Sequence, residues 1–445
     1  MKRAAYISCR HTLVSLVSIL LLTTHSFSAS SNAHVIYSFQ PGTQFPSTGL
    51  VSDRAGNLYG AIYGSKNVGN IYKVSPPSTA GGHWTETTIF TLSGVDGALP
   101  QASLILDGSG NLYGTTFDGG TGSCNFTTPG CGVVFELSPQ NGGGWIQTVL
   151  YNFQGGIDGS HPQSPLFFDA SGNLYGSTEF GGDIGCSNEN GLGCGVVFKL
   201  SPPRVPEAAW TESVVYAFRG GNDGADPQGA LLIRAGVLYG TTYLGGGSSD
   251  CQGGCGIVYA LNESGQEKVI HRFTGSDGAG PGGLVKENAG SLFGTTSLGG
   301  ESNWGTAYEL TPSSNRNWTE KVLYNFSGGE DGGNPTALTV GQAGSLYGTT
   351  TAGGNPADCG WEPPFTGCGV VFRLTASGGV WTETVLHTFT AGTMPQDVDG
   401  GVPQPSLVFG KAGFLYGATG VGGTGLCYTA KGNDSGCGTV YELVP

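Results

Sequence analysis

Charged side chains are scarce in this sequence of 445 residues. Lys and Arg number 18 and Asp and Glu number 32, so charged residues make up only 11% of the chain, against about 25% in a typical soluble protein. This composition excludes a long disordered polyelectrolyte, because such chains are rich in charge and poor in aromatic residues, whereas aromatic residues here reach 10%.

Positive charge is the scarcer kind. The formal net charge is −14, and removing the three cations among the first ten residues leaves 15 cations against 32 anions, or −17. A surface of that sign repels phosphate groups. We therefore expect neither a nucleic acid nor an anionic lipid surface as a partner.

The chain lacks an apolar run of membrane-spanning length near its start. The run at residues 13–22 is about half as long as a transmembrane helix requires. Lys2, Arg3 and Arg10 precede this run and small residues follow it, which is the layout of a secretory signal peptide. We predict a signal peptide at residues 1–33, cleaved between Ser28 and Ala33, then one domain at 34–445. The mature protein is expected to be exported, with neither a membrane segment nor a C-terminal anchor.

Residues that break helices are abundant. The chain holds 82 Gly and 23 Pro, and both residues punctuate turns and are unfavourable inside helices. An all-helical fold is therefore excluded. A chain rich in glycine and aromatic residues predicts an all-β protein.

A tripeptide of the type Leu-Tyr-Gly recurs seven times, beginning at Leu58, Leu112, Leu174, Leu238, Leu292, Leu346 and Leu415. Each copy is preceded by a short apolar segment such as residues 104–107. Each is followed by an apolar strand such as residues 133–137, and in most units by a further segment such as 145–153. These runs are rich in Val, Ile, Thr, Tyr and Phe and are bounded by Gly, Asn and Pro, so each predicts a β-strand.

Four strands in each of seven units describe a seven-bladed β-propeller with four-stranded antiparallel blades. The chain ends supply a test of a closed ring. Residues 34–39 match the fourth strand of a unit and follow no other strand, whereas the last unit stops at Pro445 without a fourth strand. We predict that the N-terminal strand completes the C-terminal blade and closes the ring, which removes two exposed sheet edges.

The recurring pattern resembles the GloVer tandem repeat of exported bacterial proteins of the choice-of-anchor type. It reads Asp-Gly-x-x-Pro, then a strand, then Gly-Asn-Leu-Tyr-Gly-Thr-Thr, then Gly-Gly and a Cys-Gly-Val-Val-Phe strand. Residues 110–116 are a full copy of the central motif, whereas Gly60-Ala61-Ile62 departs from it. The resemblance covers nearly all of residues 34–445, and it implies no activity and no catalytic residues.

Ten cysteines remain once Cys9 leaves with the signal peptide. They fall in pairs between the second and third strands, where that connection is long: Cys124 and Cys131, Cys186 and Cys194, Cys251 and Cys255, Cys359 and Cys368, Cys427 and Cys437. The two units with short connections have none. We predict five disulfides, one closing each long loop, because export permits oxidation. Zinc is the alternative, but these loops hold no His and the spacing varies.

Several attractive residues recur at equivalent positions in several units. Asp-Gly turns begin at Asp96, Asp158, Asp223, Asp277, Asp331 and Asp399, and glutamates recur at Glu86, Glu212, Glu267, Glu320 and Glu383. The Asp-Gly turns either form a ring of carboxylates that holds a cation or simply repeat because the blade repeats. His271 and His387 stand where other units have Tyr, which indicates a packing role. No catalytic motif was found, and we predict no metal and no cofactor.

The connections between the second and third strands differ between units. We predict that they lie on the same face as the Asp-Gly turns and carry the candidate ligand-binding residues. Those residues are Asn125, Phe126, Asn188, Trp361, Phe365 and Tyr428. Aromatic rings and amides on loops held by disulfides suit the recognition of sugars or extended polymers. Their alternative role is to cover their own loop.

We therefore expect a monomeric, non-enzymatic binding or scaffold module whose partner is a glycan or an envelope protein. The alternative is a carbohydrate-active enzyme, a lyase or a hydrolase, with an acidic cleft on the disulfide face. An enzyme should show one unit with titratable residues that the other units lack, and the acidic insert at residues 394–402 comes nearest to this.

Overall fold

The computed structural model describes residues 33–445 with short gaps at 41–44, 65–68, 125–128, 183–184, 187–191, 206–207, 263, 287–289, 314–316, 355–358, 360–365, 391–398, 426 and 428–435. The described residues form β-sheets and three 3₁₀ turns, η2 (Gly221–Asp223), η3 (Gln342–Gly344) and η4 (Lys411–Gly413), and contain no α-helix. None of their helical segments is long and apolar enough to span a membrane.

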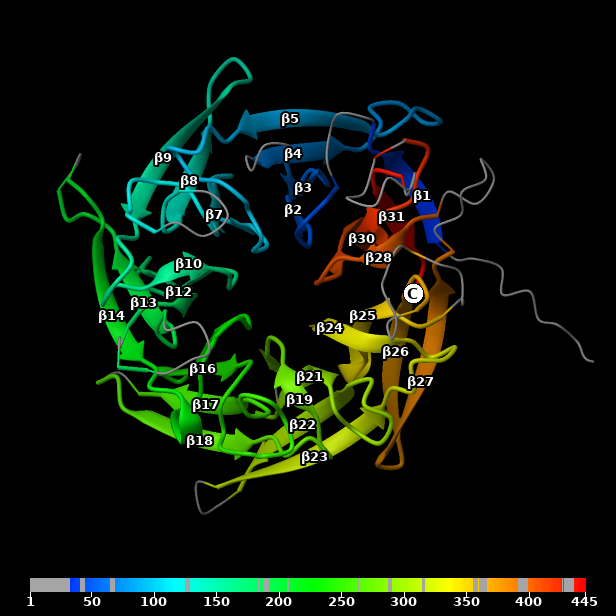
Figure 1. Ribbon diagram of the computed structural model, residues 1–445. Coiled ribbons are helices and arrows are strands. Elements are labelled where there is room, and N and C mark those ends of the chain that lie inside the picture. The colour runs from blue at the N-terminus through cyan, green and yellow to red at the C-terminus, as the bar shows by residue number, and fades with distance from the viewer. Residues whose placement is uncertain are drawn as a thin grey trace, which may run out of the picture. The chain divides into compact units, whose positions relative to one another are not determined.

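Seven antiparallel sheets, here called blades 1–7, stand around a common centre with their first strands innermost (Figure 1). Blade 1 contains β2 (Val51–Ser52), β3 (Leu58–Tyr63), β4 (Gly69–Ser75) and β5 (Thr85–Thr91). Blade 2 contains β6 (Ile105–Leu106), β7 (Leu112–Thr116), β8 (Val133–Pro139) and β9 (Trp145–Asn152). Blade 3 contains β10 (Ser160–Pro162), β11 (Phe167–Phe168), β12 (Leu174–Phe180), β13 (Val196–Ser201) and β14 (Thr211–Ala217). Blade 4 contains β15 (Leu232–Arg234), β16 (Val237–Thr242), β17 (Ile257–Leu261) and β18 (Glu267–Arg272). Blade 5 contains β19 (Ala279–Pro281), β20 (Val285–Lys286), β21 (Leu292–Leu298), β22 (Thr306–Pro312) and β23 (Trp318–Asn325). Blade 6 contains β24 (Gly333–Val340), β25 (Leu346–Ala352), β26 (Val370–Ser377) and β27 (Val380–Thr388). Blade 7 contains β28 (Gly401–Pro403), β29 (Val408–Phe409), β30 (Leu415–Val421), β31 (Thr439–Leu443) and, from the N-terminal end, β1 (Ala33–Ser38). The predicted all-β fold of seven four-stranded blades is confirmed.

The innermost strand of each blade is more broken than the sequence predicts. In blades 3, 5 and 7 it consists of two pieces, such as β10 and β11, which both pair with β12. The break follows the repeat proline, because proline has no N–H to give to the sheet. The chain here presents side chains toward the centre of the ring instead of continuing the ladder.

The Leu-Tyr-Gly repeat is explained by packing across each blade. The glycine lies directly opposite a buried aromatic residue of the third strand, as Gly60 does opposite Tyr72 and Gly114 opposite Phe135. A Cβ atom added at Gly60 would lie 2.5 Å from the Tyr72 hydroxyl oxygen. Glycine is therefore needed at this position so that the ring can cross the second strand.

Buried aromatic pairs also join neighbouring blades. The Phe that follows the fourth strand packs edge-on against the third-strand aromatic of the next blade, with centroids 5.0–5.2 Å apart in six such pairs: Phe39 and Tyr72, Phe153 and Phe198, Phe218 and Tyr259, Phe273 and Tyr308, Phe326 and Phe372, Phe389 and Tyr441. Because the interactions repeat, each blade buries its neighbour's face in the same way.

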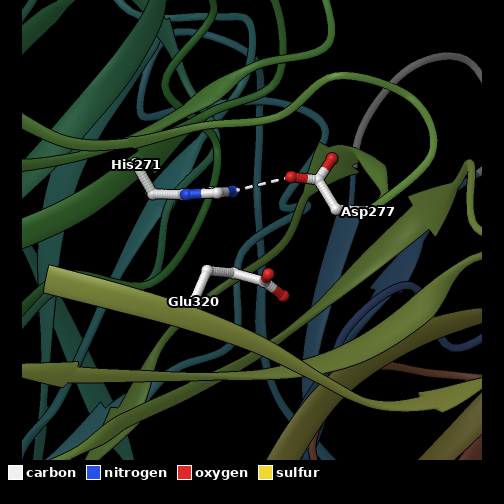
Figure 2. Close-up of side chains that lie close together, drawn as sticks. All are labelled: His271, Asp277 and Glu320. Carbon is white, nitrogen blue, oxygen red and sulfur yellow. Dashed lines mark hydrogen bonds and ion pairs between the residues drawn. The ribbon is translucent and has the colours of Figure 1, made fainter.

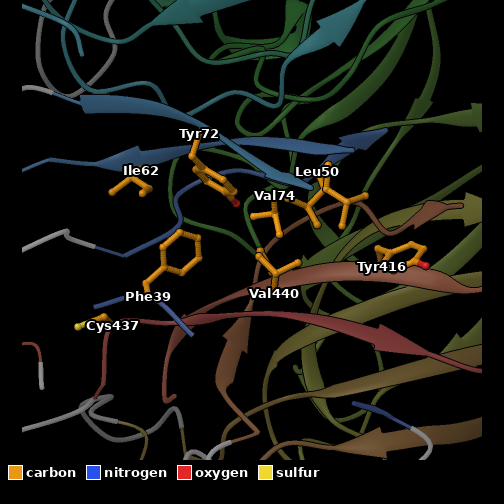
Figure 3. Close-up of a cluster of buried hydrophobic side chains, with 10 residues drawn as sticks. Phe39, Leu50, Ile62, Tyr72, Val74, Tyr416, Cys437 and Val440 are labelled. Atoms are coloured by element: carbon orange, nitrogen blue, oxygen red, sulfur yellow. The ribbon is translucent and has the colours of Figure 1, made fainter. Parts of the chain in front are cut away.

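The two ends of the domain meet in blade 7. β1 pairs antiparallel with β31, with His34 opposite Glu442 and Val35 opposite Tyr441. Phe39, just after β1, then contacts Tyr72 of blade 1, and both belong to a buried cluster with Leu50 and Val440 (Figure 3). The strand pairing predicted for the chain ends is therefore present.

The turns that lead into blades 2–6 contact the loop between the second and third strands of the same blade. Gly120 N donates to Gly94 O at 2.8 Å, and equivalent bonds recur in the next four blades, including Gly182 N to Gly156 O at 2.7 Å. A Cβ atom at Gly119 would lie 2.5 Å from Gly94 O, so the close approach requires glycine. The predicted common face for these two sets of connections is confirmed.

The ten cysteines form the five predicted intra-loop disulfides, with Cα atoms 5.0–5.8 Å apart. Each pair lies between the second and third strands, and Cys131, Cys194, Cys255, Cys368 and Cys437 are buried. Thiols joined in this way are not ligands for zinc.

Peptide mapping under non-reducing conditions is expected to recover these five links and no free thiol among the ten cysteines. Each link closes a loop of fewer than about 15 residues, so its removal should lower the free energy of unfolding by roughly 2–3 kcal/mol. Links between different loops, or unreacted thiols, would contradict the assignment.

Candidate functional site

The innermost segments of all seven blades surround a cavity of about 350 Å³. Its walls run from Gly49 in blade 1 to Ser406 in blade 7. The residue after the repeat proline reaches this cavity in five blades: Gln101, Gln163, Gln228, Gly282 and Thr336. The Asp-Gly-x-x-Pro motif, which the sequence identifies as a turn, thus places one side chain after another around the axis.

The lining of the axial pocket carries no charge, and its polar groups stand among small and apolar residues. It offers glutamine amides, the amide of Asn334, the hydroxyls of Ser297 and Thr351, and the ring of Tyr243, among small residues such as Gly, Ala and Pro. No lining residue among those described is Asp, Glu, Lys or Arg. Such a surface fits a neutral ligand that both donates and accepts hydrogen bonds.

Two rings of side chains around the axis break the symmetry of the repeat. The pre-proline ring consists of the residues before the repeat proline: Leu99, His161, Asp226, Gly280, Asn334 and Val402. The second-strand ring consists of the fifth residue after the leucine of each Leu-Tyr-Gly tripeptide: Tyr63, Phe117, Glu179, Tyr243, Ser297, Thr351 and Gly420. The two rings lie side by side, since Phe117 N donates to Leu99 O at 2.9 Å and Tyr243 N to Asp226 O at 2.8 Å.

The pre-proline ring has an unusual backbone. All six members are left-handed, and the five that are not glycine have φ of 54–59°. This conformation is uncommon for such residues, and a following proline normally pushes its predecessor into the extended region. Strained residues of this kind cluster at functional sites, and these side chains vary where the rest of the motif repeats.

Each ring contains one carboxylic acid, and the two acids face each other across the boundary between blades 3 and 4. Burial, together with the charge of Asp226, raises the pKa of Glu179 to about 8. Burial raises the pKa of Asp226 to about 6, against the lowering effect of its bond from Gln228. At neutral pH the pair therefore holds about one proton.

A buried histidine adjoins the acidic pair. His161 is 3% exposed, its Nε2 lies 3.3 Å from Oδ1 of the fully buried Asp118, and its ring packs between Phe117 and Phe180. Phe117 and Phe180 form an apolar cluster with Leu99 and the neighbouring Tyr63. One side of the rings is therefore apolar.

The opposite side of the rings is polar. Asn334 Nδ2 donates to Thr351 Oγ1 at 2.8 Å, and Ser297 Oγ donates to Gly280 O at 3.2 Å. A Cβ atom at Gly280 would lie 2.5 Å from the Tyr243 ring, so glycine makes room for that ring beside the pocket. Polar groups and one aromatic face thus lie at fixed positions on rigid strands.

The Asp-Gly turns use their carboxylates within the turn. Asp158 accepts bonds from Gln154 N at 2.8 Å and from the Tyr151 hydroxyl at 3.1 Å. His271 and His387 occupy the position of such a tyrosine and lie 3.0 Å from Asp277 and 3.2 Å from Asp399. They also pack on Phe273 and Phe389, so they replace the tyrosine as both an aromatic and a polar partner.

Among the described residues, one group of possible metal ligands comes together: His271, Asp277 and Glu320, whose ligand atoms lie within 4.8 Å of one another. Figure 2 shows the His271 ring directed at Asp277, with Glu320 approaching from β23. The neighbouring blade boundaries have the same arrangement, with Tyr in place of His and the same Asp and Glu. We therefore interpret the group as a contact between neighbouring blades that recurs around the ring, and not as a metal site.

The six loop residues predicted to bind a ligand lie outside the described residues: Asn125, Phe126, Asn188, Trp361, Phe365 and Tyr428. Most of the acidic insert at 394–402 also lies outside them. The two axial rings were not predicted from the sequence. Their signal is present in the sequence, because superposing the seven units shows two positions beside the repeat motifs that change in chemical type from unit to unit.

Comparisons with known proteins place the chain among repeat proteins. The model of the Gloeobacter/Verrucomicrobia repeat matches residues 23–253 and 247–445. A protein described as a candidate gluconolactonase is similar in structure with 12% identity, covering 71% of this chain and 84% of its own, at a TM-score of 0.35. A luciferin-regenerating enzyme shares 13% identity over 91% of this chain and 92% of its own, at a TM-score of 0.40. No curated protein matches the chain.

Proposed function

The chain belongs to the Gloeobacter/Verrucomicrobia repeat family, and from this premise we propose that it is an exported propeller that binds a neutral carbohydrate in the axial pocket without chemical turnover. The observation that carries the proposal is the uncharged lining of amides, hydroxyls and one tyrosine ring. Amides donate and accept hydrogen bonds with adjacent sugar hydroxyls, and a tyrosine ring offers an apolar face.

The size and rigidity of the pocket support a small ligand or the end of a longer one. A cavity of about 350 Å³ lies near the lower end of the range for small-molecule sites and suits about one or two sugar rings. Its lining residues lie on or next to sheet strands of all seven blades, so few side chains must be ordered when a ligand binds.

The sequence and the disulfides support export as part of the proposal. The leader has cations before a short apolar run, and five disulfides are stable in an oxidising compartment. An exported binding protein with a pocket for neutral sugars would meet glycans of the cell envelope or its surroundings.

A glycan array followed by titration calorimetry tests the proposal. We expect retention of a neutral glycan, and Tyr243→Ala should weaken the affinity by about tenfold or more through the loss of its ring face and hydroxyl. Gln154→Ala is the control, because Gln154 is exposed and does not line the pocket. Failure to retain any glycan, or equal affinity for Tyr243→Ala and the unsubstituted protein, would contradict it.

A second candidate function is glycoside hydrolysis, in which Gln163 and Gln228 would have to move aside so that the acidic pair behind them reaches the ligand. Glu179 has a pKa of about 8 and Asp226 one of about 6, so one can hold a proton while the other is ionised, as an acid and a base require. Product analysis after long incubation with the retained glycan separates the two functions. Released sugar that disappears in Glu179→Gln would establish the hydrolase.

A further inference from the structure

Two of the glutamines that line the axial pocket are held by the two ring acids. Gln163 Nε2 donates to Glu179 Oε2, and Gln228 Nε2 donates to Asp226 Oδ2 at 2.7 Å. The acids themselves do not line the pocket, whereas both glutamines do. Each carboxyl group therefore contacts the pocket through an amide.

The positions of the two acids are energetically unfavourable in several ways. Both carboxyl groups are largely removed from water, which raises the pKa of each, and the charge of Asp226 raises the pKa of Glu179 further. Asp226 has a left-handed φ of 59° before a proline, and its buried Oδ1 has no hydrogen-bond partner among the described residues. The described members of the two rings include no other acid, and these two are neighbours, so a shared role explains the placement better than chance.

The protonation state of a carboxyl group decides how it can hold an amide. An ionised carboxylate only accepts hydrogen bonds, so it fixes the amide with nitrogen toward itself and leaves the amide oxygen for another partner. A protonated carboxyl has one O–H donor and can bond the amide oxygen instead, which turns the nitrogen outward. Amide orientation is thus coupled to a proton.

We propose that Glu179 and Asp226 are positioning residues that fix the amides of Gln163 and Gln228 with their oxygens available to the ligand, and that a proton on Glu179 releases the amide of Gln163 from this orientation. The part of the inference that concerns the ligand rests on the proposed function of the axial pocket. The coupling between the acids and the amides does not.

Three other ionisable side chains lie near Glu179. Asp226 faces it from blade 4, His161 lies opposite it on β10, and Asp118 is next to His161. Because Glu179 has a pKa of about 8, the Gln163 amide should respond to pH around that value. Ligand affinity should rise by about threefold to tenfold as Glu179 ionises and the amide becomes fixed.

The first experiment needs no ligand. In protein labelled with ¹⁵N at glutamine side chains, the Gln163 amide signals, assigned by their loss in Gln163→Leu, are followed from about pH 6 to about pH 9. We expect one titration, absent in Glu179→Gln. Asp226→Asn should move it to lower pH, because the charge of Asp226 is one cause of the raised pKa of Glu179. Gln163 signals that do not titrate, or that titrate alike in all variants, would overturn the coupling.

The second experiment measures affinity for the retained neutral glycan over the same pH range. The unsubstituted protein and the control Glu301→Gln, which changes an exposed glutamate outside the pocket lining, should gain affinity with pH. Glu179→Gln should show a flat profile. Melting curves establish that each variant is folded, and Asp226→Asn provides an independent variant. If the Gln163 amide titrates but the protein binds no glycan, the proposed function is wrong and the coupling between acid and amide stands. If the amide titrates but the affinity of the unsubstituted protein does not change with pH, the acids do not position the amides for the ligand.

Discussion

Replacing Phe39 by alanine is expected to lower the free energy of unfolding by about 3–5 kcal/mol. Phe39 is 1% exposed and packs edge-on against Tyr72 of blade 1 at 5.0 Å. Figure 3 shows its ring directed into the cluster formed by residues of blades 1 and 7. The substitution leaves a cavity where the first and last parts of the domain meet, and rigid surroundings fill such a cavity only in part.

Urea unfolding measures the loss, and Phe45→Ala is the matched control. Phe45 is 40% exposed and stacks on Tyr63, with centroids 5.9 Å apart, so its removal should cost less than about 1 kcal/mol. If Phe39→Ala were as stable as Phe45→Ala, the contact between blades 7 and 1 would contribute nothing to the fold, contrary to what the burial indicates.

The architecture could be predicted because each unit encodes it locally. Runs rich in Val, Ile, Thr, Tyr and Phe define the strands, and the Gly, Asn and Pro that bound them define the turns. The extra fourth-strand sequence at residues 34–39 and the missing fourth strand of the last unit predict the pairing of β1 with β31. The broken innermost strands were not predicted. Their cause lies in two adjacent residues, because in blade 3 the left-handed conformation at His161 and the following proline together interrupt the ladder.

The axial site was harder to predict because its residues come from different units. Glu179 follows one Leu-Tyr-Gly tripeptide, Asp226 precedes the proline of the next unit, and only the ring brings them together. Their roles also depend on burial, which raises both pKa values and which no single sequence segment shows. Variation between units is most evident in the loops, where length varies most, whereas the side chains around the axis vary at constant spacing within the motifs.

The recurring glutamates illustrate the same limit. Their equivalence was evident from the sequence, but their partners were not. Each of four of them faces the Asp of an Asp-Gly turn at a blade boundary: Glu212 with Asp158, Glu267 with Asp223, Glu320 with Asp277 and Glu383 with Asp331. We call these four pairs the interblade acids, and they have a measurable consequence for stability.

The protein is expected to lose stability as the pH rises from about 4.5 to about 8. Burial is the main cause that raises the pKa of each of the four glutamates to about 7 from an ordinary value of 4.5, and the charge of the facing Asp adds to it, while His271 opposes the shift at Glu320 and Arg272 opposes it at Glu267. The folded state therefore binds these protons more tightly than the unfolded state does. The resulting stability is complete below about pH 4.5 and is lost as the pH rises through about 7.

The size of the loss follows from the shifts and from solvent screening. Each pKa unit is worth about 1.4 kcal/mol, but the four glutamates are only half-buried, so most of this is screened and about 1 kcal/mol per pair remains. The four pairs together should lower the free energy of unfolding by about 4 kcal/mol across this pH range. Urea unfolding at several pH values measures it.

Replacing all four glutamates by glutamine should remove most of this pH dependence and make the protein more stable than the unsubstituted form at about pH 8. Glutamine fits at this position, because blade 2 has Gln147 there in place of glutamate and its Nε2 donates to Asp96 O at 2.8 Å.

Glu86→Gln is the matched control. Glu86 is equivalent in position, and burial alone raises its pKa without a facing Asp. It should therefore change the profile less than any one of the four. Glu179 and Asp226 are present in every variant, so their own titration cancels in the comparison. A quadruple variant with the same stability as the unsubstituted protein at about pH 8 would show that water screens the interblade acids completely.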